Sequence, residues 1–272
     1  MRIIFVTDLH GCTWKYDKLY KVANEYEADI VINGGDMLPK NRNLFQQDRF
    51  IKRHLNKHFE KLEEANIHNL CYMGNDDLKI FDPLFDEICQ QYTYVSNIAQ
   101  RKITIQDIEF IGMNWVVDYP FRLKDLCRMD TRDYVFQHQF GTGLLSSNHG
   151  WEEIQNWYDY AETLPTIKDE LENLPSPHNT DKSVYIVHMP PAYLGLDVCG
   201  HGERVGSTSL YDFLQARQPK LSLHGHIHES PDVSGVWKAQ LKKTVCIQPG
   251  QMAKFTYVTI DLEEMEILRH TI

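Results

Sequence analysis

The first part of the chain alternates short apolar runs with helical stripes. Residues 2–7 are β-branched or aromatic with few charges, which predicts a buried strand that stops at Asp8. We expect Thr13 to be the N-cap of a helix, and a second apolar run follows at residues 29–33. The apolar residues between them fall on one helical stripe: Leu19, Val22, Ala23 and Tyr26. This order predicts a β-α-β unit.

A second helix and a change of pairing follow. Apolar residues from Ile51 to Leu62 are spaced for a long amphipathic helix, and the run at 69–73 predicts a third strand. Alternating strands and helices indicate a largely parallel sheet. Residues 103–105 and 109–113 flank a short turn instead, so we expect a hairpin there and local pairing after it.

The middle of the chain lacks a regular period. Residues from about 114 to 182 contain four prolines, a turn-like segment and a helix candidate at 151–164, which predicts an insertion or cap. Further on, strands are expected at 183–187, near Leu221, at 244–248 and at 254–260, with a helix near 207–217. Because helices are scarce between these later strands, the order favours an α/β fold with a two-sheet sandwich flanked by helices.

Composition fits an ordinary globular protein and narrows its partners. The chain has 272 residues, of which 42% are hydrophobic and 24% charged, so we expect one domain over 1–272 with the insertion inside it. A net charge of −10 argues against binding of a nucleic-acid backbone. A small anionic substrate remains compatible, provided that bound dications supply positive charge.

Cysteine usage and the apolar runs indicate a compartment. The six cysteines are scattered without a CxxC pair, which is typical of reduced thiols in a cytosolic protein. The first apolar run is too short for the core of a signal peptide, and no run approaches the length of a membrane span. These features predict a soluble, cytoplasmic protein, and they leave its oligomeric state open.

Small polar clusters follow five of the apolar runs. Their members are Asp8 with His10, Asp36, Asn75 with Asp76, His188, and His226 with His228. Strand ends are where α/β folds gather ligands. Carboxylates and an amide mixed with imidazoles suit divalent first-row metal ions. Glycines directly before three of the clusters allow the sharp turns that would aim these side chains into one pocket.

Each cluster alone is weak, because single histidines and Gly-Asp turns are common in loops. Together and in this order they resemble the motifs of the calcineurin-like metallophosphoesterase family, which are DxH, GD, GNH, H and GHxH. The match runs from Asp8 to His228. The segments 188–191 (HMPP) and 249–250 (PG) resemble a prokaryotic, single-domain branch of it. The resemblance implies the four-layer αββα fold of that family.

The resemblance also implies a site for two divalent metal ions, with Mn²⁺ expected first and Fe, Zn or Mg as alternatives. One ion would bind Asp8, His10, Asp36 and His228, and the other would bind Asp36, Asn75, His188 and His226. Such a site implies hydrolysis of a phosphomonoester or phosphodiester by a metal-bridging hydroxide. Asn75 and His188 would belong to the catalytic residues. The substrate would be a small phosphorylated compound, with nucleotide-like molecules among the candidates.

One position departs from the family pattern. Asp76 stands where many members carry the histidine of GNH, which is expected to assist the leaving group. An aspartate is normally ionised at neutral pH, so Asp76 would act as an acid only if its surroundings raised its pKa. Otherwise it would orient a ligand or a water. Asp77 beside it is expected to cap a turn.

Two other functions and one further surface stay open. A non-catalytic interaction module on the same fold would predict eroded ligands, and a nuclease would need a positive groove. Aromatic residues of the insertion are candidates for a base-binding or leaving-group pocket, although most are expected in its own core. They are Tyr119, Phe121, Tyr134, Phe136, Trp151, Trp157 and Tyr158. Three polar residues between two of the ligand motifs are candidates either for substrate contact or for an ordinary surface loop: His201, Arg204 and Ser207.

Overall fold

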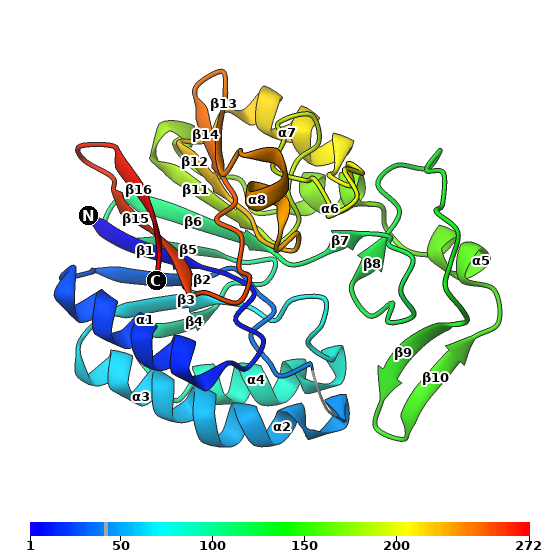
Figure 1. The fold of residues 1–272 in the computed structure, drawn as a ribbon, viewed down its shortest axis with the longest axis horizontal. Helices are drawn as coiled ribbons and strands as arrows, with labels where there is room; N and C mark the ends of the chain where they lie inside the picture. Colours follow the sequence, from blue (N-terminus) through cyan, green and yellow to red (C-terminus); the bar gives the residue numbers. More distant parts are fainter. Residues whose placement is uncertain (41–42) are drawn as a thin grey trace.

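The computed structural model describes residues 1–40 and 43–272, and two six-stranded sheets pack face to face in it with helices outside them (Figure 1). The first sheet has the order β16 (Glu266–Thr271), β15 (Thr256–Asp261), β1 (Arg2–Val6), β2 (Ile30–Asn33), β3 (His68–Cys71) and β4 (Val95–Asn97). The second has the order β13 (Lys238–Leu241), β14 (Thr244–Ile247), β12 (Leu221–Leu223), β11 (Ser183–Val187), β6 (Ile108–Met113) and β5 (Lys102–Ile105). The predicted two-sheet α/β sandwich is confirmed.

Both sheets have parallel centres; the second sheet has an antiparallel strand at each edge, and the first sheet has antiparallel strands at one edge only. Strands β1 to β4 run parallel, and β15 and β16 extend the first sheet antiparallel. The predicted β5–β6 hairpin is present, and the expectation of local pairing after it is correct only in part. The consecutive strands β9–β10, β13–β14 and β15–β16 pair antiparallel, whereas β6, β11, β12 and β14 run parallel. The crossover from β6 to β11 is the insertion itself, and α7 (Thr208–Arg217) lies between β11 and β12.

Helices on the first sheet differ from the prediction in detail. They are α1 (Thr13–Glu25), α2 (Gln47–Phe50), the π-helical η2 (Ile51–Leu55), α3 (Asn56–Glu64) and α4 (Asp82–Cys89), with 3₁₀ turns η1 (Leu44–Gln46) and η3 (Lys79–Phe81). The predicted long helix is thus continuous but contains a π-helical turn. The prediction for Thr13 is wrong: Cys12 is the N-cap, Thr13 is the first helical residue, and no side chain caps this end.

The strands explain how the layers are filled. Ile4 and Val6 of β1 pack under the helices of the first sheet, whereas Ile3 and Phe5 pack between the two sheets. Successive side chains of a strand point to opposite faces, so a central strand of a four-layer fold must be apolar on both. A third cluster, which includes Tyr185, covers the outer face of the second sheet under α7. This layering holds the strand ends of both sheets at one edge.

The segment 114–182 has its own small elements. They are β7 (Val116–Val117), β8 (Cys127–Arg128), β9 (Gly143–Ser147), β10 (Gly150–Ile154), α5 (Trp157–Glu162), α6 (Ile167–Asn173) and η4 (Thr180–Lys182). The prediction of one helix over 151–164 is wrong in its first half. Gly150 has a φ of 112°, and Trp151 pairs with Ser146 across the β9–β10 hairpin. Trp157 and Ile167 join the outer cluster of the second sheet.

Three further observations concern the cysteines, the last helix and the search for membrane-spanning helices. All six cysteines are free, and four of them are buried. The short α8 (Ser230–Ser234) follows β12. In the two described stretches, 1–40 and 43–272, no helix combines the length and the apolar character that a membrane span needs.

Candidate metal centre

Polar side chains from both sheets meet at the carboxyl ends of the parallel strands. Strands β1, β2 and β3 are followed by residues of the first three clusters, and β11 and β12 by the histidine motifs. Parallel strands present these ends at the same edge, which brings together segments far apart in sequence. The structure brings together all the predicted ligands: Asp8, His10, Asp36, Asn75, His188, His226 and His228.

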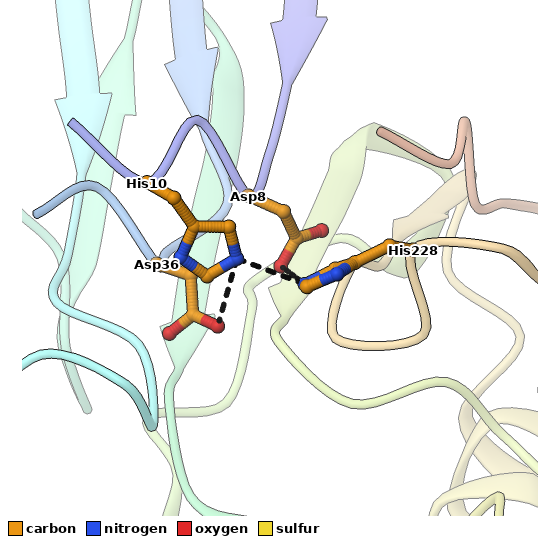
Figure 2. A group of neighbouring side chains, drawn as sticks. All are labelled: Asp8, His10, Asp36 and His228. Carbon is orange, nitrogen blue, oxygen red and sulfur yellow. Dashed lines mark hydrogen bonds and ion pairs between the residues drawn. The ribbon is translucent and has the colours of Figure 1, made fainter. Parts of the chain in front are cut away.

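Four side chains form the first group. Figure 2 shows Asp8, His10 and Asp36 facing His228, which comes from the opposite side of the site. His10 Nε2 lies 2.9 Å from His228 Nε2 and 3.8 Å from Asp36 Oδ2, and His228 Nε2 lies 3.5 Å from Asp8 Oδ1. One possible ligand atom from each residue lies within 4.8 Å of all the others. Metal–ligand distances near 2 Å would fit between them.

A second group adjoins the first and shares Asp36 with it. Asn75 Oδ1 lies 2.9 Å from His188 Nε2 and 2.6 Å from His226 Nδ1, and His188 Nε2 lies 3.6 Å from Asp36 Oδ2. His188 Nδ1 lies 2.7 Å from the carbonyl oxygen of Gly34. A proton on Nδ1 would donate to that carbonyl, and Nε2 is the ring nitrogen that faces Asn75 and Asp36.

The backbone around these groups is held in an uncommon conformation. The φ angles are 56° at Asp8, 44° at His10, 51° at Asp36 and 69° at His226, all in the left-handed region. Non-glycine residues rarely adopt it, and such residues gather at functional sites. Hydrogen bonds between the loops hold them there: Asp8 N donates to Gly35 O at 3.0 Å, and His10 N donates to Asp36 O at 2.9 Å.

Asp77 fastens the loops together. Its fully buried carboxylate accepts hydrogen bonds from the backbone N–H groups of Met37, Leu38 and Gly74, at 2.9, 2.8 and 2.9 Å. The expected role in capping a turn is therefore extended, because Asp77 joins the loop after β2 to the loop after β3. Gly74 is required at its position, since a Cβ there would overlap Oδ1 of Asp36.

Burial and neighbouring charges shift the pKa values of the carboxylates and histidines in the site in different directions. Burial alone would raise the pKa of Asp36, but the charge of His188 and a hydrogen bond from it hold that pKa well below its usual range. Burial likewise lowers the pKa of His188, and Asp36 outweighs burial to raise it to about 9. Burial lowers the pKa of His10 to about 4 and that of His226 to about 3. These two imidazoles are neutral at pH 7, as metal ligation requires.

Asp76 forms a pair with Lys40, a residue that belongs to none of the predicted clusters. Lys40 Nζ lies 3.1 Å from Asp76 Oδ2 and 3.1 Å from His10 Nε2. Burial and the charge of Asp36 raise the pKa of Asp76, and Lys40 acts in the opposite direction. The backbone N–H of Asp76 donates to Asp36 Oδ1 at 2.8 Å. An Asp–Lys pair therefore occupies the position of the histidine in the GNH motif.

Residues between the histidine motifs have different environments. His201 lines a cavity beside the ligand groups, whereas Arg204 is an exposed loop residue. Ser207 is fully buried and accepts a hydrogen bond from Leu210 N as the N-cap of α7, so the alternative of a surface loop is wrong for it. His224 was not predicted at all, and it is buried with Nδ1 3.0 Å from the carbonyl oxygens of two residues, Val187 and Met189. Its only signal is a histidine directly before GHxH.

Known proteins resemble this chain in its motifs and in its fold. The calcineurin-like phosphoesterase family matches residues 1–230. A search of curated proteins finds no match. Among solved structures, TT1561 of Thermus thermophilus has a TM-score of 0.62 at 15% identity, covering 99% of this chain and 98% of that chain.

Two further solved structures share the fold. A dimetal phosphatase from Danio rerio has a TM-score of 0.54 at 8% identity, covering 100% of this chain and 95% of that chain. A structure described as a novel archaeal phosphodiesterase has a TM-score of 0.50 at 12% identity, with both chains covered fully at 100%. At such identities these likenesses concern the fold alone. The family match, however, spans every motif that lies at the strand ends, and the chain therefore belongs to the calcineurin-like phosphoesterase family.

Proposed function

We propose that this protein is a metal-dependent hydrolase that cleaves phosphomonoester or phosphodiester bonds at a dinuclear site. The observation that supports it is the pair of adjoining ligand groups that share one buried carboxylate, Asp36. The first ion would be held by Asp8, His10, Asp36 and His228, and the second by Asp36, Asn75, His188 and His226. In this proposal residues 1–272 form one domain, and residues 114–182 form a cap beside the site.

The donor atoms fit divalent cations. Asp8 Oδ2 is buried and has no hydrogen-bond partner among residues 1–40 and 43–272, so lone pairs in the cluster remain available. A mixture of oxygen donors and neutral imidazoles suits Mn²⁺, with Fe, Zn or Mg as alternatives. When bound, two such ions would orient a phosphoryl group, lower the pKa of a water between them and stabilise the leaving oxygen. The free cysteines support a reducing compartment such as the cytoplasm.

Side chains at the rim would position the substrate. Lys40 lies against Asp76 and His10 and would donate to a phosphoryl oxygen, because an ammonium group binds phosphate as a point charge. Asp76 accepts from Lys40 and from Asn75 Nδ2, the latter at 3.3 Å. This arrangement makes Asp76 a positioning residue for Lys40 and Asn75. Although burial raises the pKa of Asp76, its side chain accepts both of these hydrogen bonds, so we assign it no role as a general acid, which favours esters with good leaving groups.

The test combines metal analysis with a substrate panel. Protein loaded with manganese would be assayed on p-nitrophenyl phosphate, bis(p-nitrophenyl) phosphate, and 2′,3′- and 3′,5′-cyclic nucleotides. We expect two ions per chain and turnover of at least one ester that a chelator abolishes. Full metal occupancy without any turnover would contradict the hydrolase. Less than one ion per chain after loading would instead support a non-catalytic module, and retention on heparin at moderate salt would support a nuclease.

A further inference from the structure

A cavity of about 720 Å³ opens beside the ligand groups, a size suited to a small organic molecule. One end contains Asp36, Asn75 and the two histidines of GHxH. The insertion forms one wall, and the loop at 199–205 forms part of another. The two walls differ in chemistry, and this difference indicates what the cavity accepts.

Aromatic rings from the insertion form a continuous surface that starts at the ligand groups. The ring of Tyr119 lies 5.8 Å from that of His226, and Phe121 lies 5.9 Å from Tyr119. Phe140 lies 5.5 Å from Phe121 at an interplanar angle of 84°. Phe121 is 62% exposed and Phe140 is 65% exposed. Large apolar side chains left open to solvent at the wall of a polar site mark a binding surface.

The aromatic wall is fixed by a buried ion pair. Asp118 and Lys124 have fully buried side chains, with Asp118 Oδ1 2.7 Å from Lys124 Nζ. Trp157 Nε1 donates to the same carboxylate at 2.9 Å, and Gln139 Nε2 donates to Oδ2 at 2.9 Å. Asp118 precedes Tyr119 and Gln139 precedes Phe140, so this one carboxylate connects both segments that provide rings. A preformed wall of this kind costs little ordering entropy when a ligand binds.

The opposite wall is acidic. Glu203 and Glu229 line it, and Glu229 Oε1 accepts a hydrogen bond from Gly200 N at 3.0 Å. Among the described residues that line the cavity, Lys40 is the only lysine or arginine, and it lies at the metal end. Among the described lining residues, a phosphate or carboxylate far from the ligand groups would therefore meet two glutamates and no lysine or arginine.

Building on the proposed phosphoesterase function, we propose that the substrate is an ester of one phosphate whose organic group is planar and carries no negative charge. An aryl alcohol or a nucleoside fits this description. The ring stacks on the face of one of these two phenylalanines, Phe121 or Phe140, and meets the edge of the other, while the phosphate lies at the ligand groups. Stacking on exposed aromatic side chains tolerates many rings, because each of them has a π face. Polyphosphates and bisphosphorylated compounds are disfavoured by the acidic wall.

Phosphonates that cannot be hydrolysed test the planar group directly. Manganese-loaded protein would be titrated calorimetrically with phenylphosphonate and with cyclohexylphosphonate, which have the same number of carbons but differ in planarity. We expect phenylphosphonate to bind about tenfold more tightly, because only its planar ring can stack on an aromatic side chain and stacking contributes about 1–3 kcal/mol to binding. The double variant F121A/F140A should abolish this preference, and the milder Phe121→Leu should reduce it. Tyr193→Ala, at an aromatic residue that is 66% exposed outside the cavity, should keep it.

The acidic wall is tested with an anionic ring. We expect 4-carboxyphenylphosphonate to bind about two- to fivefold more weakly than phenylphosphonate, which is the size of one exposed charge interaction. In the Glu203→Lys variant the carboxylated compound should bind more tightly than phenylphosphonate. Equal affinities for the phenyl and cyclohexyl compounds, or no binding of either, would overturn the inference. The proposed function would stand in that case if esters of the panel were still hydrolysed. The absence of any hydrolysis by metal-loaded protein would overturn the proposed function itself, so the two failures are distinguishable.

Discussion

The two sheets contribute different chemistry to the same site. Loops of the first sheet provide the oxygen donors, and those of the second provide most of the imidazoles. We call the loops of the first sheet the oxygen side of the site and those of the second sheet its imidazole side. On the oxygen side three ligand residues have backbone angles in the left-handed region, Asp8, His10 and Asp36, whereas on the imidazole side only the ligand residue His226 does. Uncommon backbone angles cost about 1–3 kcal/mol each and persist only where the surroundings enforce them. The oxygen side therefore depends on its loops being held together.

The imidazole side depends instead on where the strands end. His188 directly follows β11, and its Nδ1 lies 2.7 Å from Gly34 O of the first sheet. Gly225 N donates to His188 O at 2.8 Å, which joins the two histidine loops. The two sides should therefore respond differently to substitution. Replacing a histidine on the imidazole side removes one ligand atom, whereas replacing a residue on the oxygen side removes either a ligand shared by both groups or a hydrogen bond that holds a loop in place.

Asp36→Asn should have the largest effect, because one carboxylate faces both ligand groups. Asparagine tolerates the left-handed backbone, so the change isolates the charge. We expect loss of both ions and a fall in kcat of about a thousandfold or more, since several kcal/mol of transition-state stabilisation disappear. Elemental analysis and steady-state assays measure this. Asp48→Asn, at a carboxylate paired with Lys52, is the control. Retention of one ion would contradict the sharing of Asp36.

His188→Gln should remove one ion and leave the other. His188 contacts Asn75 and Asp36 but lies outside the group formed around Asp8. We expect one ion per chain and activity reduced about a hundredfold, as when one stabilising group of a transition state is lost. His178→Gln is the control, because the His178 side chain is 89% exposed. Loss of both ions would show that the two groups are not separable.

Asp77→Ala should break the oxygen side without touching a ligand. Three buried backbone N–H groups would lose their acceptor, so we expect the free energy of unfolding to fall by about 3 kcal/mol. Urea denaturation in the presence of a chelator measures this without a contribution from bound metal. Asp77→Asn keeps one acceptor oxygen and should lose less. Unchanged stability of the alanine variant would mean that the loops do not need this support.

Lys40→Gln should have the smallest of these effects. It removes the ammonium group beside Asp76 and His10 but no proposed ligand. We expect kcat/KM to fall about tenfold, as for one charge-assisted hydrogen bond, at unchanged metal content. Lys52→Gln, at an exposed lysine, is the matched control. An unchanged kcat/KM would place Lys40 outside the substrate's reach.

The sequence predicts the ligand clusters because their signal is local. An apolar run followed by a polar motif indicates a strand and the chemistry at its end, and the structure places those ends together. Lys40 carries no such signal. It meets Asp76 only because the loops after β2 and β3 pack together, 36 residues apart in sequence. Contacts of this kind depend on tertiary packing, which a motif does not encode.

The missed strands have a physical explanation as well. Strands β13 and β16 lie at sheet edges, and several of their side chains are exposed, so the sequence there shows no continuous apolar run. Trp151 belongs to the helix candidate at 151–164, but the turn at Gly150 pairs it across a hairpin. The parallel centre of the second sheet was missed because the long insertion, rather than a helix alone, makes the crossover before β11.

The buried ion pair of Asp118 and Lys124 affects which positions of this protein can be substituted during evolution. It holds the aromatic wall through contacts within the insertion, at a distance in sequence from the strained loops that gather the ligands. We therefore expect substitutions at Phe121 and Phe140 to leave the ligand groups in place. Under the proposed function, directed evolution toward new esters should randomise these two exposed positions and leave Asp118 intact, because the aromatic wall and the ligand groups belong to separable parts of the chain.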